Sequence, residues 1–123
     1  MKKKMIIIGG GISGIYLSIL LKKYLDMDVV VLEANDKPLK KLLATGNGRC
    51  NLSNKDLDKA HYDGDIKPWV NDIIHDFDIV EALKDIGLYT KYMGNLLYPY
   101  SESAKAVRSE ERRVGKECIA LCR

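Results

Sequence analysis

The 123-residue sequence has few cysteines, no long apolar run and almost no excess charge. Of its three cysteines only Cys50 lies within residues 1–107, which excludes an internal disulfide framework there and fits a reducing compartment. Apolar stretches such as residues 5–8 are far too short to span a bilayer. Residues 1–107 carry 15 lysines and arginines against 14 acidic residues, so nothing favours nucleic acid or a membrane as partner. We therefore expect a cytoplasmic protein.

The composition that remains is that of a globular domain. Hydrophobic residues make up 46% and charged residues 30% of the chain, which is too apolar for a disordered segment. A chain of this length builds one hydrophobic core rather than two. The search for function therefore narrows to motifs within a single domain.

The first third of the chain has the pattern of a βαβ unit. Residues 4–8 and 28–33 are short runs rich in β-branched residues, and their continuous apolarity predicts parallel strands buried on both faces. Between them, apolar residues recur at helical spacing over residues 12–24. Strand, glycine turn, helix and strand within about 30 residues define this unit.

The rest of the chain is less regular. A turn at residues 35–38 leads to a short helical start at residues 40–43, and residues 45–54 have almost no apolar content and predict a loop. Helical spacing returns from Pro68, and two further elements follow: a helix over residues 78–86 and a hairpin of residues 88–92 and 96–98. The fold class is therefore α/β, an incomplete Rossmann-like βαβ unit for a dinucleotide, with a short helical and hairpin extension.

The glycine-rich turn carries the first chemical signal. Gly9, Gly11 and Gly14 fit G-x-G-x-x-G: they allow the tight turn, the approach of a pyrophosphate and the close packing of helix on strand. The helix N-terminus attracts the phosphates, and Ser13 adds a hydroxyl donor. Glu33 follows 19 residues after Gly14, at the end of the second strand, where it would bind the ribose hydroxyls of NAD or FAD and disfavour NADP. The alternative is a glycine turn that binds no ligand.

A second motif, TGNGRCN, occupies residues 45–51. Two glycines separated by Asn47 can place successive N–H groups in an anion-binding concavity. Arg49 can pair with a phosphate, and the amides of Asn47 and Asn51 can donate and accept hydrogen bonds. The alternative is an ordinary polar surface loop.

These residues together resemble one flavoprotein family. The matching blocks are residues 9–14, Glu33, residues 40–54 and residues 96–104. They are similar to the bacterial BaiN-like, or aminoacetone oxidase-like, NAD(P)/FAD-dependent oxidoreductases over about residues 5–107. One departure is that the arginine usual in the last block is replaced around Asn95. Family members are several times longer than this chain, so residues 1–107 resemble the N-terminal part of an FAD-binding domain.

The resemblance implies FAD as cofactor. It places the pyrophosphate on Gly9, Gly11, Ser13 and Gly14, the ribose on Glu33, and the rest of the cofactor along Lys41, Thr45, Asn47, Arg49 and Asn51. It implies hydride transfer between the flavin and a small organic substrate or NAD(P)H, as carbon–carbon double-bond reduction or amine oxidation. No catalytic residue and no metal ligand can be named. Two alternatives remain: a truncated, non-catalytic dinucleotide-binding fragment, and an NAD-dependent dehydrogenase.

The composition changes at Arg108. Residues 108–118 can be encoded by a sequence beginning AGATCGGAAGAGC, which resembles a common short-read sequencing adapter translated in frame. We therefore expect residues 108–123 to be a non-native tail joined to the gene after Val107. The alternative is a genuine basic tail in which Cys118 and Cys122 bind a metal, although two cysteines cannot complete a tetrahedral site.

Overall fold

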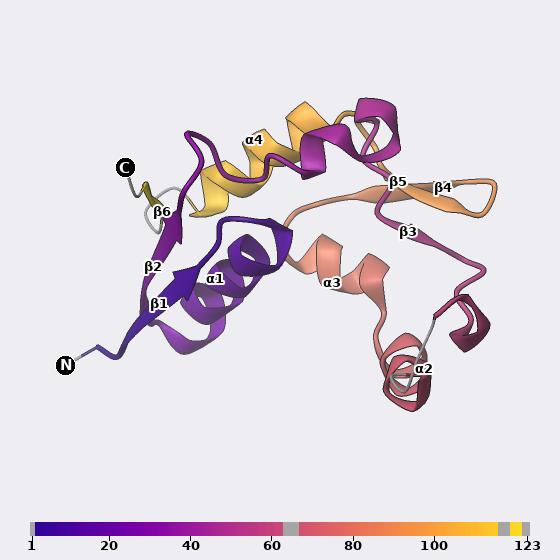
Figure 1. Ribbon diagram of the computed structural model, residues 1–123, viewed down its shortest axis with the longest axis horizontal. Helices are drawn as coiled ribbons and strands as arrows, with labels where there is room; N and C mark the ends of the chain where they lie inside the picture. The colour runs from indigo at the N-terminus through magenta and orange to yellow at the C-terminus, as the bar shows by residue number, and fades with distance from the viewer. Residues whose placement is uncertain (1, 63–66, 116–118, 122–123) are drawn as a thin grey trace. The chain divides into compact units, whose positions relative to one another are not determined.

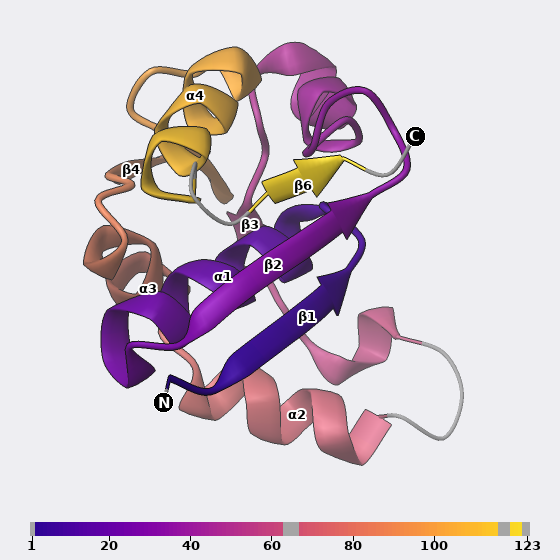
Figure 2. The ribbon, with the colours of Figure 1, turned by 90° about the vertical axis from the view of Figure 1, so that its left-hand side faces the viewer.

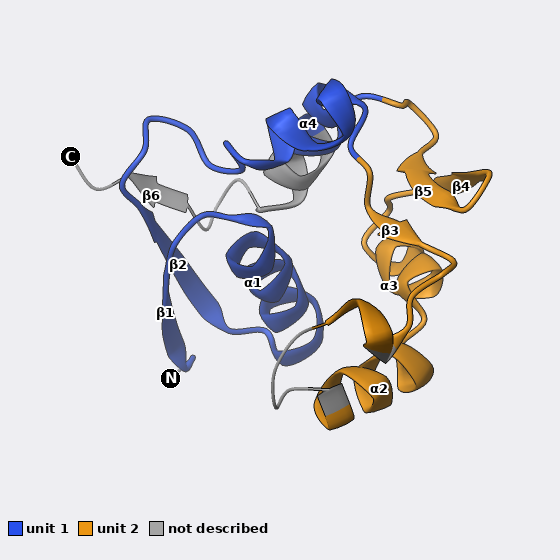
Figure 3. Cartoon of the chain, turned by 45° about the vertical axis from the view of Figure 1, so that its right-hand side comes forward, with its two compact units in different colours: residues 1–50, 103–123 blue, residues 51–102 orange. Residues whose placement is uncertain are grey.

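The structure is a computed structural model that describes residues 2–62, 67–115 and 119–121. The chain forms two compact units (Figure 3): unit 1 comprises residues 1–50 and 103–123, and unit 2 comprises residues 51–102. No helix in the described ranges combines the length and apolarity needed to cross a membrane.

Unit 1 is built on a parallel sheet with the strand order β1-β2-β6 (Figure 2). Strand β1 (Lys4–Ile8) pairs in parallel with β2 (Asp28–Glu33), and β2 pairs in parallel with β6 (Ile119–Leu121). Helix α1 (Ile12–Leu25) connects β1 to β2 and covers one face of the sheet. The predicted βαβ unit is therefore confirmed, with bounds within a residue of those expected.

The core of unit 1 lies between α1 and β2. Ile15 and Ile19 point inward from the helix, and Val29 and Val31 point inward from the strand, all at most 4% exposed. Val30, between the two valines, is 41% exposed, because successive side chains of a strand face opposite sides of the sheet. Strand β2 thus buries one face in the described structure.

The prediction that β1 is buried on both faces is wrong. Met5, Ile6 and Ile8 are 38%, 65% and 88% exposed. Within the described residues β1 lies at the edge of the sheet and pairs with β2 alone. A run of apolar residues indicates a central strand only if other elements cover it, and none of the described elements of unit 1 covers the outer side of β1. The third strand, β6, comes instead from the tail and joins the opposite side of β2.

Two further elements complete unit 1. The 3-10 segment η1 (Leu42–Gly48) contacts helix α4 (Ala104–Gly115), and α4 also contacts α1 (Figure 1). Ala104 and Val107 of α4 are each 1% exposed. The α4 helix therefore continues across the expected boundary after Val107, with both of these buried residues on its N-terminal side.

The prediction of an unstructured loop over residues 45–54 needs correction. Segment η1 extends to Gly48, and a short strand, β3 (Ser53–Asn54), begins five residues later. Residues 45–47 leave helical dihedral angles, with Gly46 and Asn47 both left-handed at φ 56° and 54°. Sequence patterns miss such a segment because backbone hydrogen bonds, rather than apolar periodicity, hold it.

Unit 2 is a small antiparallel sheet with helices. Strand β5 (Leu96–Pro99) pairs with β3 on one side and with β4 (Thr90–Met93) on the other. The helices are η2 (Lys59–His61), α2 (Lys67–Asp76) and α3 (Ile79–Asp85). Asp78 caps α3 by accepting hydrogen bonds from the N–H groups of Val80 and Glu81. The predicted hairpin and the predicted helix over residues 78–86 are confirmed.

Candidate dinucleotide-binding site

The turn between β1 and α1 requires glycine at two positions for different reasons. Gly9 has a φ of +103°, a conformation that side chains rarely adopt. A Cβ on Gly14 would strike the carbonyl oxygen of Gly9 and lie 3.2 Å from Ile7 Cγ2. The turn is tied to the neighbouring strand by a 2.8 Å hydrogen bond from the Gly9 N–H to the Leu32 carbonyl. Gly9 and Gly14 therefore allow the tight turn and the close packing of α1 against it.

The N-terminus of α1 is open to an anion. Gly11 is the N-cap residue, no side chain caps the helix, and its first turn has no acidic residue. A Cβ on Gly11 would meet nothing within 4 Å, so the space above it is free. Uncapped N–H groups and the helix dipole favour a phosphate here, and Ser13 lines the same space.

The Glu33 carboxylate is buried and held by three short hydrogen bonds. Its Oε2 accepts from the Gly10 N–H at 2.7 Å, and its Oε1 accepts from the Asn35 N–H at 2.7 Å and from Asn35 Nδ2 at 2.6 Å. Glu33 is 8% exposed. The bonds from the Asn35 backbone, the Asn35 side chain and then Gly10 outweigh the desolvation and lower the pKa of Glu33. Glu33 is thus ionised and fixed in orientation.

Both backbone polar groups of Gly10 form hydrogen bonds, and we call this arrangement the clamp. Its N–H donates to Glu33, and its carbonyl accepts a 2.8 Å hydrogen bond from the N–H of Leu39, a buried residue in the left-handed region. A Cβ on Gly10 would lie 2.9 Å from Glu33 Oε2 and 3.2 Å from Pro38 Cβ. The clamp therefore brings the ends of β1 and β2 and the following loop to one place.

A cleft of about 450 Å³ opens at this place. It is lined by Gly10, Gly11, Ile12, Ser13, Glu33, Asn35, Leu39, Lys40, Lys41, Leu42 and Thr45. Five of the ten predicted cofactor contacts are among these residues: Gly11, Ser13, Glu33, Lys41 and Thr45. The lining combines a helix N-terminus and two lysines with a carboxylate, as a ligand with phosphates and hydroxyls requires.

The predicted contacts that follow in the chain lie elsewhere. Asn47 and Arg49 do not line the cleft, and Asn51 belongs to unit 2. Within the loop, the Arg49 N–H donates to the Gly46 carbonyl and the Cys50 N–H to the Thr45 carbonyl. These two donors hold the loop together and are not available for the anion-binding concavity that the sequence predicts. The assignment of Asn47, Arg49 and Asn51 to the cofactor stays a prediction.

Six cleft residues were not predicted as cofactor contacts: Gly10, Ile12, Asn35, Leu39, Lys40 and Leu42. Gly10 occupies a variable position of the glycine motif, but its place in the middle of three consecutive glycines was a signal that a side chain has no room there. Asn35 follows the strand end by two residues, where asparagine commonly bonds to nearby chain atoms. Lys40 lies in the same block of the family resemblance as Lys41, but the resemblance places only Lys41 along the cofactor.

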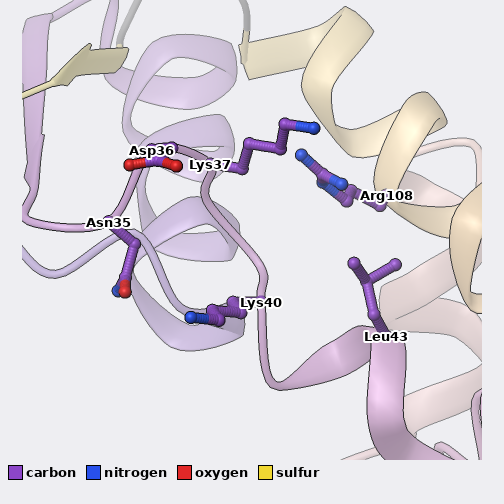
Figure 4. Close-up of a pocket in the computed structure, with 6 residues that line it drawn as sticks. All are labelled: Asn35, Asp36, Lys37, Lys40, Leu43 and Arg108. Carbon is purple, nitrogen blue, oxygen red and sulfur yellow. The ribbon is translucent and has the colours of Figure 1, made fainter.

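A second pocket of about 330 Å³ adjoins the cleft (Figure 4). It shares Asn35 and Lys40 with the cleft and is otherwise lined by Asp36, Lys37, Leu43 and Arg108. In Figure 4 the side chains of Lys37 and Arg108 approach each other across this space. Its wall thus includes the first residue of the expected non-native tail.

In the described ranges, no three His, Cys, Asp or Glu side chains gather as a metal site requires.

Comparison with known proteins agrees with this geometry. Residues 7–39, from β1 to the loop that clamps Gly10, match the family described as NAD(P)-binding Rossmann-like domain. The predicted fold class, a Rossmann-like α/β dinucleotide-binding unit, is thereby confirmed.

The chain is also 40% identical over 105 residues to the 3-dehydro-bile acid delta(4,6)-reductase of Clostridium scindens. The match covers 82% of this chain and 26% of that protein, so the chain spans about a quarter of the length of this curated relative. The chain therefore combines a Rossmann-like dinucleotide-binding unit with similarity to a reductase.

Proposed function

We propose that this chain is the FAD-binding part of a flavin-dependent oxidoreductase of the BaiN-like family. The observation that carries the proposal is the cleft itself, where the uncapped N-terminus of α1 faces the same space as the ionised Glu33 carboxylate. Similarity to a reductase over most of the chain supports a redox cofactor rather than a nucleotide used for another purpose.

Each part of the cleft suits one part of the cofactor. The N–H groups at the start of α1, with Ser13, would bind the pyrophosphate, and the open space above Gly11 lets it approach the backbone. Glu33 would accept a hydrogen bond from the adenosine ribose, and Lys41 would balance the phosphate charge. Bound FAD would supply hydride transfer with an organic substrate or NAD(P)H.

The carboxylate also bears on which dinucleotide is bound. A buried, ionised Glu33 repels a 2′-phosphate, which disfavours NADP in this cleft. NAD remains the second candidate, since the matching family is described by NAD(P) binding.

The name of the relative favours reduction of a carbon–carbon double bond over amine oxidation as the reaction of the whole protein. The lone buried Cys50 in residues 1–107 supports a cytoplasmic location.

The test is direct binding of nucleotides to the purified chain. We expect FAD to bind, with the visible absorbance of oxidised flavin retained after gel filtration, and NADP not to bind. Binding of NAD without FAD would instead favour a dehydrogenase. Gly11→Ala is the matched variant, because its new methyl enters the space of the pyrophosphate without striking the protein.

A non-catalytic fragment is the alternative that one structural feature favours. Ile6 and Ile8 of the edge strand β1 are 65% and 88% exposed, which is typical of a sheet that lacks a neighbour. If the chain binds no nucleotide and shows no cooperative thermal transition, this alternative replaces the FAD proposal.

We also propose that residues 108–123 are foreign to the native protein. The support is that an adapter-like nucleotide sequence can encode residues 108–118, together with the position of the described core residues of α4, Ala104 and Val107, before the boundary. Long-read sequencing of the gene across codon 107 is the test. A reading frame that continues differently after Val107 is expected, whereas recovery of the same tail codons would make α4 and β6 genuine parts of unit 1.

A further inference from the structure

We propose that Asn35 is a positioning residue, which aims the Glu33 carboxylate so that one group holds the glycine turn and also receives the ribose. The proposal rests on the dinucleotide function above. It adds a residue that neither the glycine motif nor the strand-end acid identifies.

Hydrogen bonds from Asn35 and Gly10 reach different oxygens of the carboxylate. A carboxylate offers about four acceptor positions, two on each oxygen. Asn35 occupies Oε1 twice, through its backbone N–H at 2.7 Å and its Nδ2 at 2.6 Å. The Gly10 N–H occupies Oε2 once, at 2.7 Å. The two bonds from Asn35 keep the carboxylate from rotating away, so that it stays directed at the cleft where a ribose hydroxyl would bind.

Asparagine suits this task better than its neighbours in size. Its amide nitrogen donates, whereas an aspartate at the same position would place a second anion against Oε1. Alanine would keep the backbone bond and lose the side-chain bond. Asn35 is itself exposed on the rim of the cleft, so its substitution removes little packing.

The charged groups around Glu33 lie on the loop that follows β2, except for Arg108 of α4. Lys40 and Lys41 line the cleft with it, and Asp36, Lys37 and Arg108 lie in the adjoining pocket. The cleft-lining residues of the β1–α1 turn, residues 10–13, carry no titratable side chain. Burial raises the pKa of Glu33, and the hydrogen bonds from Asn35 and Gly10 more than reverse this effect. Loss of the Asn35 Nδ2 donor should therefore raise the pKa of the Glu33 carboxylate.

The experiment follows the Gly10 amide by NMR in the full 123-residue chain while the pH is lowered. A hydrogen bond to a carboxylate makes the amide shift report the protonation of Glu33, and Glu33→Gln abolishes that titration. We expect the midpoint to rise in the order wild type, Asn35→Ala, Asn35→Asp. Asp36→Asn serves as the control. It removes a neighbouring negative charge and keeps the hydrogen bonds from Asn35 to Glu33, so it should lower the midpoint or leave it unchanged.

Equal midpoints in wild type, Asn35→Ala and Asn35→Asp overturn the proposal. Asn35→Ser provides a second, smaller donor if a variant loses its dispersed spectrum, and its midpoint is expected below that of Asn35→Ala. In parallel, Asn35→Asp is expected to weaken FAD binding near neutral pH by roughly tenfold, as loss of an oriented hydrogen bond to a charged group does. Shifted midpoints without any FAD binding by the wild type would support the role of the Asn35–Glu33 hydrogen bonds and overturn the proposed function instead.

Discussion

The N–H of Gly10 donates a 2.7 Å hydrogen bond to Oε2 of Glu33 and so joins the turn after β1 to the end of β2. The two residues are 23 positions apart in the chain, at the carboxyl ends of neighbouring parallel strands. This end of a parallel sheet is where open α/β folds bind their ligands. The bond therefore ties the stability of the fold to the geometry of the cleft.

Gly14→Ala and Gly11→Ala should separate folding from binding. The methyl of Gly14→Ala meets the Gly9 carbonyl, so we expect a loss of about 1–3 kcal/mol in the free energy of unfolding, measured by urea denaturation. Gly11→Ala meets nothing and should lower that free energy by only about 0.5 kcal/mol, because alanine is a poorer N-cap than glycine, while weakening FAD binding roughly tenfold. Equal stability of the two variants would contradict the packing role of Gly14.

Glu33→Gln should remove a defined part of the acid sensitivity. The folded state lowers the pKa of Glu33, so the stability it contributes is fully present above the ordinary glutamate pKa of about 4.3 and is lost as the pH falls through the lower, folded value. At neutral pH the variant should unfold at a lower urea concentration than the wild type. The difference in the urea concentration of unfolding between the wild type and Glu33→Gln should narrow below pH about 4. A gap that stays constant down to acid denaturation would show that the carboxylate charge is not what stabilises the turn.

Lys41→Gln should weaken cofactor binding through charge alone. Lys41 is exposed on the rim of the cleft, where solvent screens it, so we expect roughly two- to fivefold weaker FAD binding at low salt. The difference should vanish as added salt shortens the Debye length. Lys55→Gln in unit 2 removes the same charge outside the cleft and is the control. If both variants bind equally, Lys41 has no part in the site.

Leu97→Ala should destabilise the small sheet of unit 2. Leu97 is fully buried at the centre of β5, between β3 and β4, so we expect a loss of about 2–5 kcal/mol and faster amide exchange along β4 and β5. Ile8→Ala truncates a similar side chain that is 88% exposed, and its effect should stay within about 0.5 kcal/mol. A neutral Leu97→Ala would show that this sheet has no core of its own.

Much of unit 1 could be predicted because local patterns specify it. The β-branched runs, the helical spacing between them and the glycines of the turn each act over a few residues, and Gly9 and Gly14 have the dihedral and packing requirements that the motif implies. The position of Glu33 in the cleft followed from a fixed chain length between turn and strand end. The hairpin and the Asp78 cap of unit 2 were equally local.

Only the tertiary structure decided which contacts these elements make. Apolarity made β1 look central, but exposure depends on neighbours, and β1 lies at the edge of the described sheet. The polar TGNGRCN segment has hydrogen bonds within itself that no spacing rule predicts. Gly10 and Asn35 meet at Glu33 because two strand ends lie side by side. The sequence by itself thus determined the βαβ unit and its class of ligand, since both arise from short-range geometry. The folded chain determined how the carboxylate is held, since that depends on atoms distant in sequence.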